Sequence, residues 1–277
     1  MTIPKIKADE FTCLAAYVYD ISGIVLDDSK GYLIESRLGP LVVELDCRDY
    51  LVLCELARTD ARVRGRIVDA ISTNETSFFR DAAPFELFKH KIVPDHIDRQ
   101  NGPSPTLNIW SAASSTGQEV YSIAITLKEL LVDLSPWRIR IVGTDISEAA
   151  VAQASAGRYN QIEIQRGLTD DKRHQYFEIQ GNVWCIQDEL RAMARFQQFN
   201  LLSEFPPLGK FDIIFCRNVA IYFDIETRMA LFDRIANQLN RNGVLLIGST
   251  ESLLGISDRF SRQEYHNSVY YSLREDQ

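Results

Sequence analysis

The chain has 277 residues, of which 45% are hydrophobic and 25% charged, and its formal net charge is −8. This composition is typical of a soluble globular protein, and the length allows one large and one small domain. The acidic balance argues against a nucleic-acid-binding protein that relies on broad attraction to phosphates. No apolar run is long enough to cross a bilayer and the first residues contain no signal-peptide stretch, so we expect a cytoplasmic protein without membrane insertion.

The five cysteines are scattered and form no CxxC pair. Such an odd, dispersed set argues against a disulfide framework and against a structural zinc, and we expect no metal site. The chain shows neither internal repeats nor a low-complexity segment.

Apolar residues recur at helical spacing from residue 8 to about residue 72, without strand alternation. This pattern predicts an N-terminal helical domain over residues 1–72. Its third helix is expected at 49–56 and its fourth at 60–71. Gly39-Pro40 should interrupt or bend the second helix.

A helix is expected at about 84–97, and from Thr106 onward strand and helix patterns alternate. This alternation predicts an α/β domain over residues 73–277 with a doubly wound, mostly parallel sheet. Strands are expected at 107–112, 138–145, 194–200, 211–218 and 243–249, helices at 117–132, 147–155 and 225–239, and a closing antiparallel hairpin at 260–274 with its turn near Asn267.

Residues 157–191 break the alternation. They contain a short helix near 170–176 and then a hairpin that turns at Gly181-Asn182. We interpret them as a small inserted β-subdomain.

The corner between the first strand and its helix, IWSAASSTGQEVYS (109–122), holds small and hydroxyl side chains. Ligands bind beyond the carboxyl ends of strands in open α/β sheets, and small side chains let a ligand approach the backbone. The dinucleotide signature GxGxxG is missing, because only Gly117 is present, which weakens the case for a pyrophosphate ligand.

Two acids at this edge fit a nucleoside that carries an amino group, as S-adenosylmethionine does: Glu119 in the first helical turn, and Asp145 at the end of the second strand, where a carboxylate can accept ribose hydroxyls. Each has a structural alternative. Thr116 and Glu119 match a capping box, and Asp145 could be a turn acid before a cap at Ser147.

Six segments in chain order resemble the CheR family of chemotaxis receptor glutamate methyltransferases. They are TNETSFFRD (73–81), IWSAASSTGQEVYSIAI (109–125), GTDIS (143–147), FNLL (199–202), FDIIFCRNVAIYFD (211–224) and NGVLLIGSTESLLG (242–255). The resemblance implies a class I S-adenosylmethionine-dependent methyltransferase fold, with the helical domain before it and the β-subdomain inserted in it.

The resemblance also implies cofactor contacts with S-adenosylmethionine, whose product is S-adenosylhomocysteine. Asn74, Thr76 and Arg80 would close over the cofactor, with Arg80 near its carboxylate. Glu119 would meet its amino acid end, and Asp145 its ribose.

The remaining implied contacts follow two later strands. Asn200 and Leu201 would flank the adenine, and Arg217 and Asn218 would line the floor after the fourth strand. Tyr222 would lie near the transferred methyl group, where its ring or phenol oxygen could favour the sulfonium. Tyr222 and Arg80 are the predicted catalytic residues.

These positions also have structural alternatives. Arg80 could pair with Asp81, Asn200 could be a strand-end turn residue, Asn218 could cap the coming segment, and Tyr222 could belong to the core.

The implied reaction methylates glutamate side chains of chemoreceptor cytoplasmic helices. A glutamate has a pKa of about 4.3 and is already ionised at neutral pH, so no general base is expected. None of the four histidines falls in the motifs.

Two regions depart from the family pattern. The second-helix region holds only Arg37 and Arg48 where more basic residues are usual, and Lys89 and Lys91 are candidates to compensate. The loop after Phe177 is short, so we expect no dependence on a receptor's C-terminal pentapeptide tether.

Two other functions stay open: a cofactor-binding adaptor that methylates no receptor, and a methyltransferase for another substrate.

Overall fold

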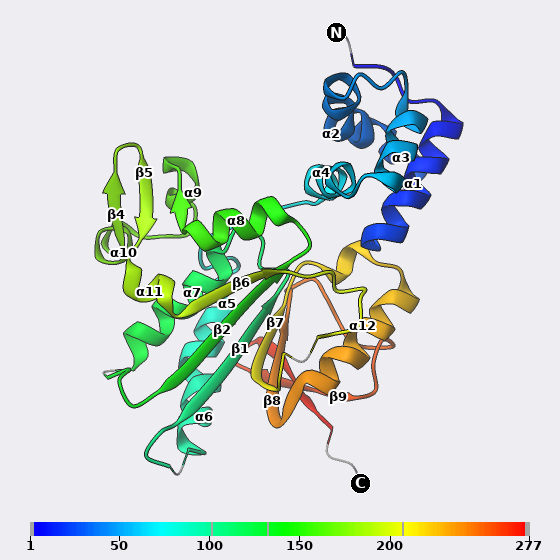
Figure 1. Cartoon of the computed structure of the whole chain (residues 1–277). Helices are drawn as coiled ribbons and strands as arrows, with labels where there is room; N and C mark the ends of the chain where they lie inside the picture. The colour runs from blue at the N-terminus through cyan, green and yellow to red at the C-terminus, as the bar shows by residue number, and fades with distance from the viewer. Residues whose placement is uncertain (1–2, 101, 132, 207, 275–277) are drawn as a thin grey trace.

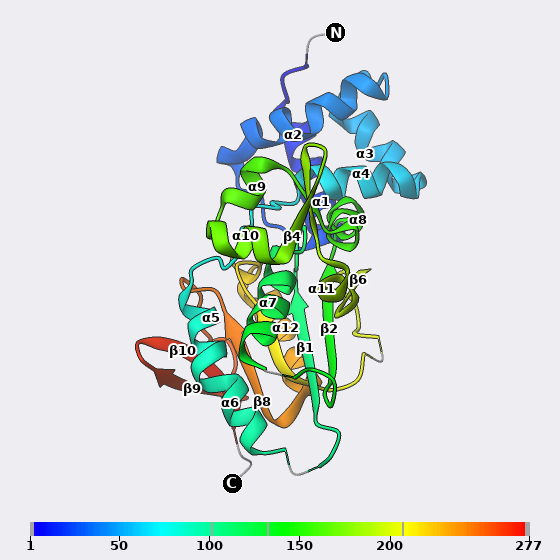
Figure 2. The ribbon, with the colours of Figure 1, turned by 90° about the vertical axis from the view of Figure 1, so that its left-hand side faces the viewer.

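The computed structural model describes residues 3–100, 102–131, 133–206 and 208–274. A helical N-terminal domain is followed by an α/β domain with an open twisted sheet, and a small subdomain is inserted in the latter (Figure 1). The N-terminal domain and the subdomain both lie at the end of the sheet where β1 and β2 finish (Figures 1 and 2).

Four helices of the N-terminal domain pack their apolar faces into a single core that includes Leu14, Ile34 and Leu38. The expected interruption at Pro40 is wrong. The second helix continues through it, because Leu38 and Leu41 on either side are buried in that core. The elements are α1 (Ala8–Ser22), the 3₁₀ turn η1 (Asp28–Lys30), α2 (Gly31–Glu44), α3 (Tyr50–Thr59) and α4 (Ala61–Ile71).

Seven strands among the described residues form the main sheet, in the order β6-β2-β1-β7-β8-β10-β9. The first five are parallel, and β10 and β9 close the sheet as an antiparallel hairpin, as predicted. Their bounds are β1 (Thr106–Ala112), β2 (Arg138–Asp145), β6 (Ala194–Gln198), β7 (Phe211–Cys216), β8 (Leu239–Ile247), β9 (Phe260–Tyr265) and β10 (Ser268–Leu273).

Helices cover both faces of this sheet, because its central strands are apolar on both sides. In β1, Ile109 packs with α7 (Gln118–Leu130), and the next residue, Trp110, packs with α12 (Ile225–Gln238) on the opposite face. Figure 1 shows α12 on one side of the sheet and α5, α6 and α7 on the other. The remaining helical elements of these layers are α5 (Ala83–Leu87), the π-helix η2 (Phe88–Ile92), α6 (Val93–Asp98), α8 (Glu148–Ala156) and the 3₁₀ turn η3 (Ala220–Tyr222).

The insertion is a three-stranded sheet with the order β3-β5-β4, accompanied by short helices. Its β4–β5 hairpin turns at Gly181-Asn182, as predicted. Tyr159 and Phe177 join its core to Phe78 of the segment that links the two domains. Its elements are β3 (Arg158–Tyr159), α9 (Gln161–Gln165), α10 (Asp170–Tyr176), β4 (Phe177–Gln180), β5 (Val183–Ile186) and α11 (Asp188–Ala192).

The chain order places a ligand crevice at one point of the sheet. After β1 the chain moves outward to β2 and β6, and it then returns to the other side of β1 to form β7. Such a reversal leaves a gap beyond the carboxyl ends of the two central strands.

Candidate functional site

A cleft lies at this reversal point, between the sheet edge, the linking segment and the N-terminal domain. Its empty volume is about 910 Å³ when the solvent at its mouth is included. That size is within the range of small-molecule sites. All ten residues predicted for the site line it: Asn74, Thr76, Arg80, Glu119, Asp145, Asn200, Leu201, Arg217, Asn218 and Tyr222.

The loop between β1 and α7 forms the wall of the cleft nearest the sheet. Ala113 and Ser115 have φ values of +67° and +49°, and Gly117 has +96°. The first two are costly for residues with a side chain, and such strain is typical of functional loops. At Gly117 a Cβ atom would lie 2.9 Å from the Ala154 side chain, so only glycine lets the loop approach α8.

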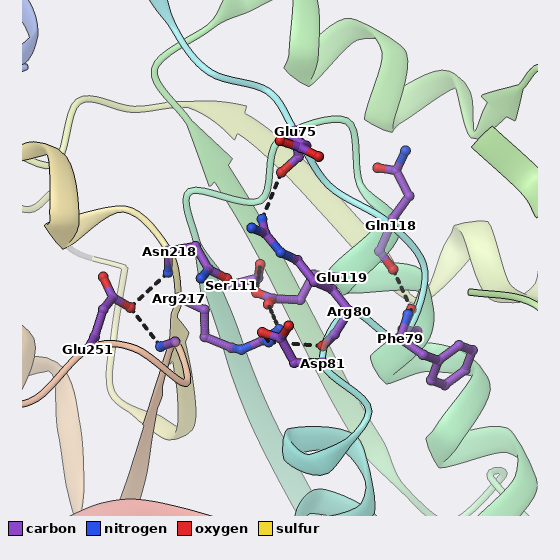
Figure 3. A network of polar contacts seen from close by, with 12 residues as sticks. Glu75, Phe79, Arg80, Asp81, Ser111, Gln118, Glu119, Arg217, Asn218 and Glu251 are labelled. Carbon is purple, nitrogen blue, oxygen red and sulfur yellow. Dashed lines mark hydrogen bonds and ion pairs between the residues drawn. The ribbon is translucent and has the colours of Figure 1, made fainter. Parts of the chain in front are cut away.

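An ion network forms the floor of the cleft (Figure 3). Arg217, just after β7, donates to Glu119 Oε2 at 2.9 Å and to Asp81 Oδ2 at 2.8 Å. A further bond of 2.9 Å from Arg217 reaches the Arg80 carbonyl oxygen, and Ser111 donates to Glu119 Oε1 at 2.7 Å. The network therefore joins β1, α7, β7 and the linking segment.

The network decides two of the open alternatives. Helix α7 begins after Gly117, which makes no side-chain cap, and both Glu119 oxygens are bound within the network, so the capping-box interpretation is wrong. Asp81 pairs with Arg217 rather than with Arg80. Of the two acids, Glu119 lines the cleft, where its carboxylate can face the ammonium group of an amino acid while the Arg80 guanidinium can face the carboxylate.

Asp145 forms the turn that the sequence offered as an alternative, and it also lies at the cleft. Its Oδ1 accepts the Ser147 N–H at 3.0 Å and its Oδ2 accepts the Ser115 N–H at 2.8 Å, while Ser147 itself caps α8. Burial raises the pKa of Asp145, and these backbone bonds oppose that rise. Its carboxylate thus forms the turn and also lines the cleft.

Asn200 and Leu201 form the wall beyond β6. The Asn200 amide donates to the Ile21 carbonyl of the N-terminal domain at 2.9 Å and accepts the Leu202 N–H at 3.0 Å. Asn200 is therefore a turn residue that also ties the two domains together. Leu201 is buried against the α12 side of the sheet and offers an apolar surface to the cleft.

The linking segment passes over the opposite side of the cleft. The Asn74 carbonyl accepts the Ser115 hydroxyl at 3.2 Å, which holds the segment against the β1–α7 loop. Arg80 donates to the Glu75 carbonyl at 2.8 Å, so its guanidinium stays at the cleft (Figure 3). Thr76 lines the cleft between them.

Glu251 was not among the predicted site residues, although it lies within a matched segment. Its Oε2 accepts the N–H groups of Asn218 at 2.8 Å and Gly248 at 2.7 Å. Asn218 has a φ of +57°, so the Glu251 carboxylate holds a strained residue at the cleft floor. The Asn218 side chain does not cap η3, so the cap predicted as its alternative role is not formed. Glu251 could have been predicted as a site residue, because it is an acid that follows a strand end, and an acid at a strand end was the signal used for Asp145.

Tyr222 ends η3 and is half-buried at the cleft, next to the fully packed Phe223. Its carbonyl accepts the Val25 N–H of the N-terminal domain at 3.0 Å. The side chain also packs on the α12 side of the core, so the core interpretation applies to it, and its role near the transferred methyl group stays a prediction.

Comparison with known proteins gives the same picture for the whole chain. Residues 74–269 match the family described as "CheR methyltransferase, SAM binding domain", and residues 9–72 match "CheR methyltransferase, all-alpha domain". The chain belongs to the CheR methyltransferases. It therefore has a class I methyltransferase fold, and its cofactor is S-adenosylmethionine.

Two curated relatives of this CheR chain match over nearly their full length. "Chemotaxis protein methyltransferase Cher2" of Pseudomonas putida is 34% identical over 271 residues, which cover 96% of this chain and 98% of the relative. "Chemotaxis protein methyltransferase" of Vibrio parahaemolyticus is 37% identical over 280 residues, which cover 99% and 100%.

The cleft of this CheR chain fits the cofactor in charge and in polarity. The Glu119 carboxylate suits the ammonium group, the Arg80 guanidinium suits the carboxylate, and Asp145 offers a carboxylate to hydroxyl donors. The Ser114 hydroxyl is buried at the cleft without a partner among the described residues, and a polar ligand could satisfy it.

Proposed function

We propose that this CheR chain transfers a methyl group from S-adenosylmethionine to glutamate side chains of chemoreceptor cytoplasmic helices, and that it forms glutamate methyl esters. The observation that carries this proposal is that the described residues lining the cleft include no imidazole and no carboxylate that lacks a bound donor. The carboxylates of Glu75, Glu119 and Asp145 all hold donors already, and no histidine lies among the described lining residues.

A site without a free base favours an acceptor that needs no deprotonation. A hydroxyl or amine acceptor must lose a proton to a base during the transfer, whereas a glutamate carboxylate is ionised at neutral pH. In the transfer a carboxylate oxygen bonds to the methyl carbon while the carbon–sulfur bond breaks. The electron pair stays on sulfur, and no proton moves.

The cofactor supplies an electrophilic methyl group on a positively charged sulfur. The protein contributes alignment: Arg217 and Glu119 would hold the amino acid end, and Asp145 would hold the ribose. Arg80 and Tyr222 lie at the cleft where the acceptor has to approach. Because the two reacting ions neutralise one another, exclusion of water by the linking segment favours the transfer more than added charge would.

Few basic side chains are available to attract an acidic acceptor. Arg37 is committed to the carbonyl oxygens of Ile71 and Ser72 at 2.6 and 3.1 Å. Lys89 pairs with Glu129 and Lys91 pairs with Asp95, and neither lysine is among the described residues that line the cleft. Among the described residues that line the cleft, Arg80 and Arg217 carry the positive charges, and Arg217 already pairs with Asp81 and Glu119.

We also propose that the chain does not depend on a receptor tether. The β4–β5 hairpin closes over the two residues Gly181-Asn182, which leaves no long loop on the subdomain. Calorimetry should detect no tight binding of a receptor's C-terminal pentapeptide. A dissociation constant in the low micromolar range would contradict this.

The test of the main proposal uses methyl-labelled S-adenosylmethionine and purified chemoreceptor cytoplasmic domains. We expect label on the receptor that mild base releases as methanol, because esters are base-labile. Receptor domains whose methylated glutamates are changed to alanine serve as the control. Base-stable label would indicate a different acceptor group, and cofactor binding without any label would indicate an adaptor.

A further inference from the structure

The cleft is not built by the α/β domain alone. The last residue of α1 and the loop after it, Ser22–Val25, contribute Ser22 and Ile24 to its lining. Figure 1 shows the end of α1 beside the chain that enters α12. We call this stretch of the N-terminal domain the α1 junction.

The α1 junction holds two walls of the cleft by hydrogen bonds. Ile21, just before it, accepts the Asn200 amide at 2.9 Å, and the Val25 N–H donates to the Tyr222 carbonyl at 3.0 Å. One turn earlier, the Tyr19 hydroxyl donates to Asp224 at 2.5 Å. The junction thus bridges the segments after β6 and after β7.

Close packing accompanies these bonds at Gly23. Its φ is +71°, which ends α1 in the left-handed conformation. A Cβ atom here would lie 2.9 Å from a methyl group of Leu202 and 3.2 Å from the Phe223 ring. Glycine is therefore favoured by the backbone, and an added Cβ would also have to displace the Leu202 side chain or move the junction away from the Phe223 ring.

We propose that the α1 junction is a positioning element of the cofactor site, and that Gly23 is the residue that lets it seat. This inference rests on the proposed placement of the cofactor in the cleft. When the junction is seated, Asn200 and Tyr222 keep the spacing that the nucleoside and the transferred methyl group need. When a substitution displaces the junction, only a fraction of the protein molecules keeps it seated. The cofactor binds that fraction, so its apparent dissociation constant equals the intrinsic one divided by the seated fraction.

The test measures binding of S-adenosylhomocysteine by calorimetry to the full chain and to Gly23→Ala. We expect the dissociation constant of Gly23→Ala to rise about tenfold. The matched control is Gly31→Ala in the same domain, where φ is −53° and the nearest atom would lie 3.7 Å from the new Cβ. Its affinity should stay within about twofold of the unchanged chain.

A second variant covers the case in which Gly23→Ala fails to fold. Tyr19→Phe removes a single oxygen, the donor to Asp224, and should raise the dissociation constant about threefold. Tyr32→Phe is its control, since Tyr32 is 70% exposed on α2. If both Gly23→Ala and Tyr19→Phe bind the ligand as the unchanged chain does, the inference is overturned.

Hydrogen exchange separates positioning from a purely structural role. Addition of S-adenosylhomocysteine should slow exchange of the Val25 amide, because ligand binding favours the seated junction, while amides of α3 should not change. Equal rates at Val25 with and without ligand would overturn the inference. These measurements need no acceptor, so a failure to methylate receptors would count against the proposed function only.

Discussion

The two ends of the cleft are built in different ways. At the end that we propose for the amino acid portion of the cofactor, Ser111, Glu119, Asp81 and Arg217 bind one another through their side chains, with a buried cation at the centre. At the end that we propose for its nucleoside, the groups that face the cleft are held mainly by backbone N–H and carbonyl groups, and part of the support comes from the N-terminal domain.

This difference predicts how each end responds to substitution. A charge network in a low-dielectric site leaves uncompensated charges when one member is removed, so stability and binding fall together. At the other end, substitution of one side chain removes its own contact with the ligand, so binding weakens. Most contacts of the fold remain, because backbone groups supply them. The predictions below use this contrast.

The largest effect is expected for Arg217→Met. The Arg217 side chain is 2% exposed, and its loss leaves Glu119 and Asp81 without their shared cation. The free energy of unfolding should fall by about 3–5 kcal/mol, and binding of S-adenosylhomocysteine should be lost. Denaturant unfolding and calorimetry measure the two quantities.

Arg262→Met is the matched control for this substitution. Arg262 is 57% exposed and pairs with Glu264 on β9, so its removal should change the unfolding free energy by less than about 0.5 kcal/mol. If Arg217→Met were as mild as Arg262→Met, the amino acid end would not be a charge network in the sense argued above.

Asp145→Ala should affect binding more than stability. Loss of a charged acceptor for the ribose hydroxyls should weaken S-adenosylhomocysteine binding roughly 10- to 100-fold, which corresponds to about 1.5–3 kcal/mol. Calorimetry with the exposed Asp133→Ala as control checks this. Unchanged affinity in Asp145→Ala would show that the ribose lies elsewhere.

The pH dependence of binding should identify the same group. Burial raises the folded-state pKa of Asp145, and the ribose needs the ionised form, so affinity should fall as pH drops through that raised pKa. The acid limb should therefore begin at a higher pH than for an ordinary aspartate, and Asp145→Asn should lack it. An identical limb in Asp145→Asn would assign the titration to another group.

Stability of the ligand-free protein should show the opposite trend at this residue. Because the folded pKa of Asp145 lies above the unfolded one, the folded state binds more protons between the two values. The contribution of Asp145 to the unfolding free energy therefore falls as pH rises through that interval. Comparison of Asp145→Asn with the unchanged chain across this range isolates the contribution.

The smallest effect is expected for Tyr222→Phe. The ring stays in place, and the carbonyl still accepts the Val25 N–H, so only the phenol oxygen is lost, which we predict to lie near the methyl group. The turnover rate should fall about two- to fivefold, with little change in cofactor affinity. A loss above a hundredfold in steady-state assays would mean that the hydroxyl has a direct chemical role.

The regular elements were predictable because local periodicity determines them. The strand at 138–145 has the predicted bounds, and the helix predicted at 225–239 ends one residue earlier. Strand β7 ends at Cys216 rather than 218, because the chain turns at Asn218 with a positive φ. Strand β8 begins at Leu239 rather than 243, since pairing with Phe211 draws the polar residues after Leu239 into the sheet.

The sequence by itself determined that the candidate residues after the strands, such as Asp145 and Asn218, would share one edge, because parallel strands present their carboxyl ends on the same side of a sheet. The family resemblance alone placed Asn74, Thr76 and Arg80 there. Only the tertiary structure decided their partners. Asp81 and Arg217 are 136 positions apart, and Asn200 and Ile21 are 179 positions apart. Local patterns carry no information about which distant groups meet, since those meetings depend on how the domains pack.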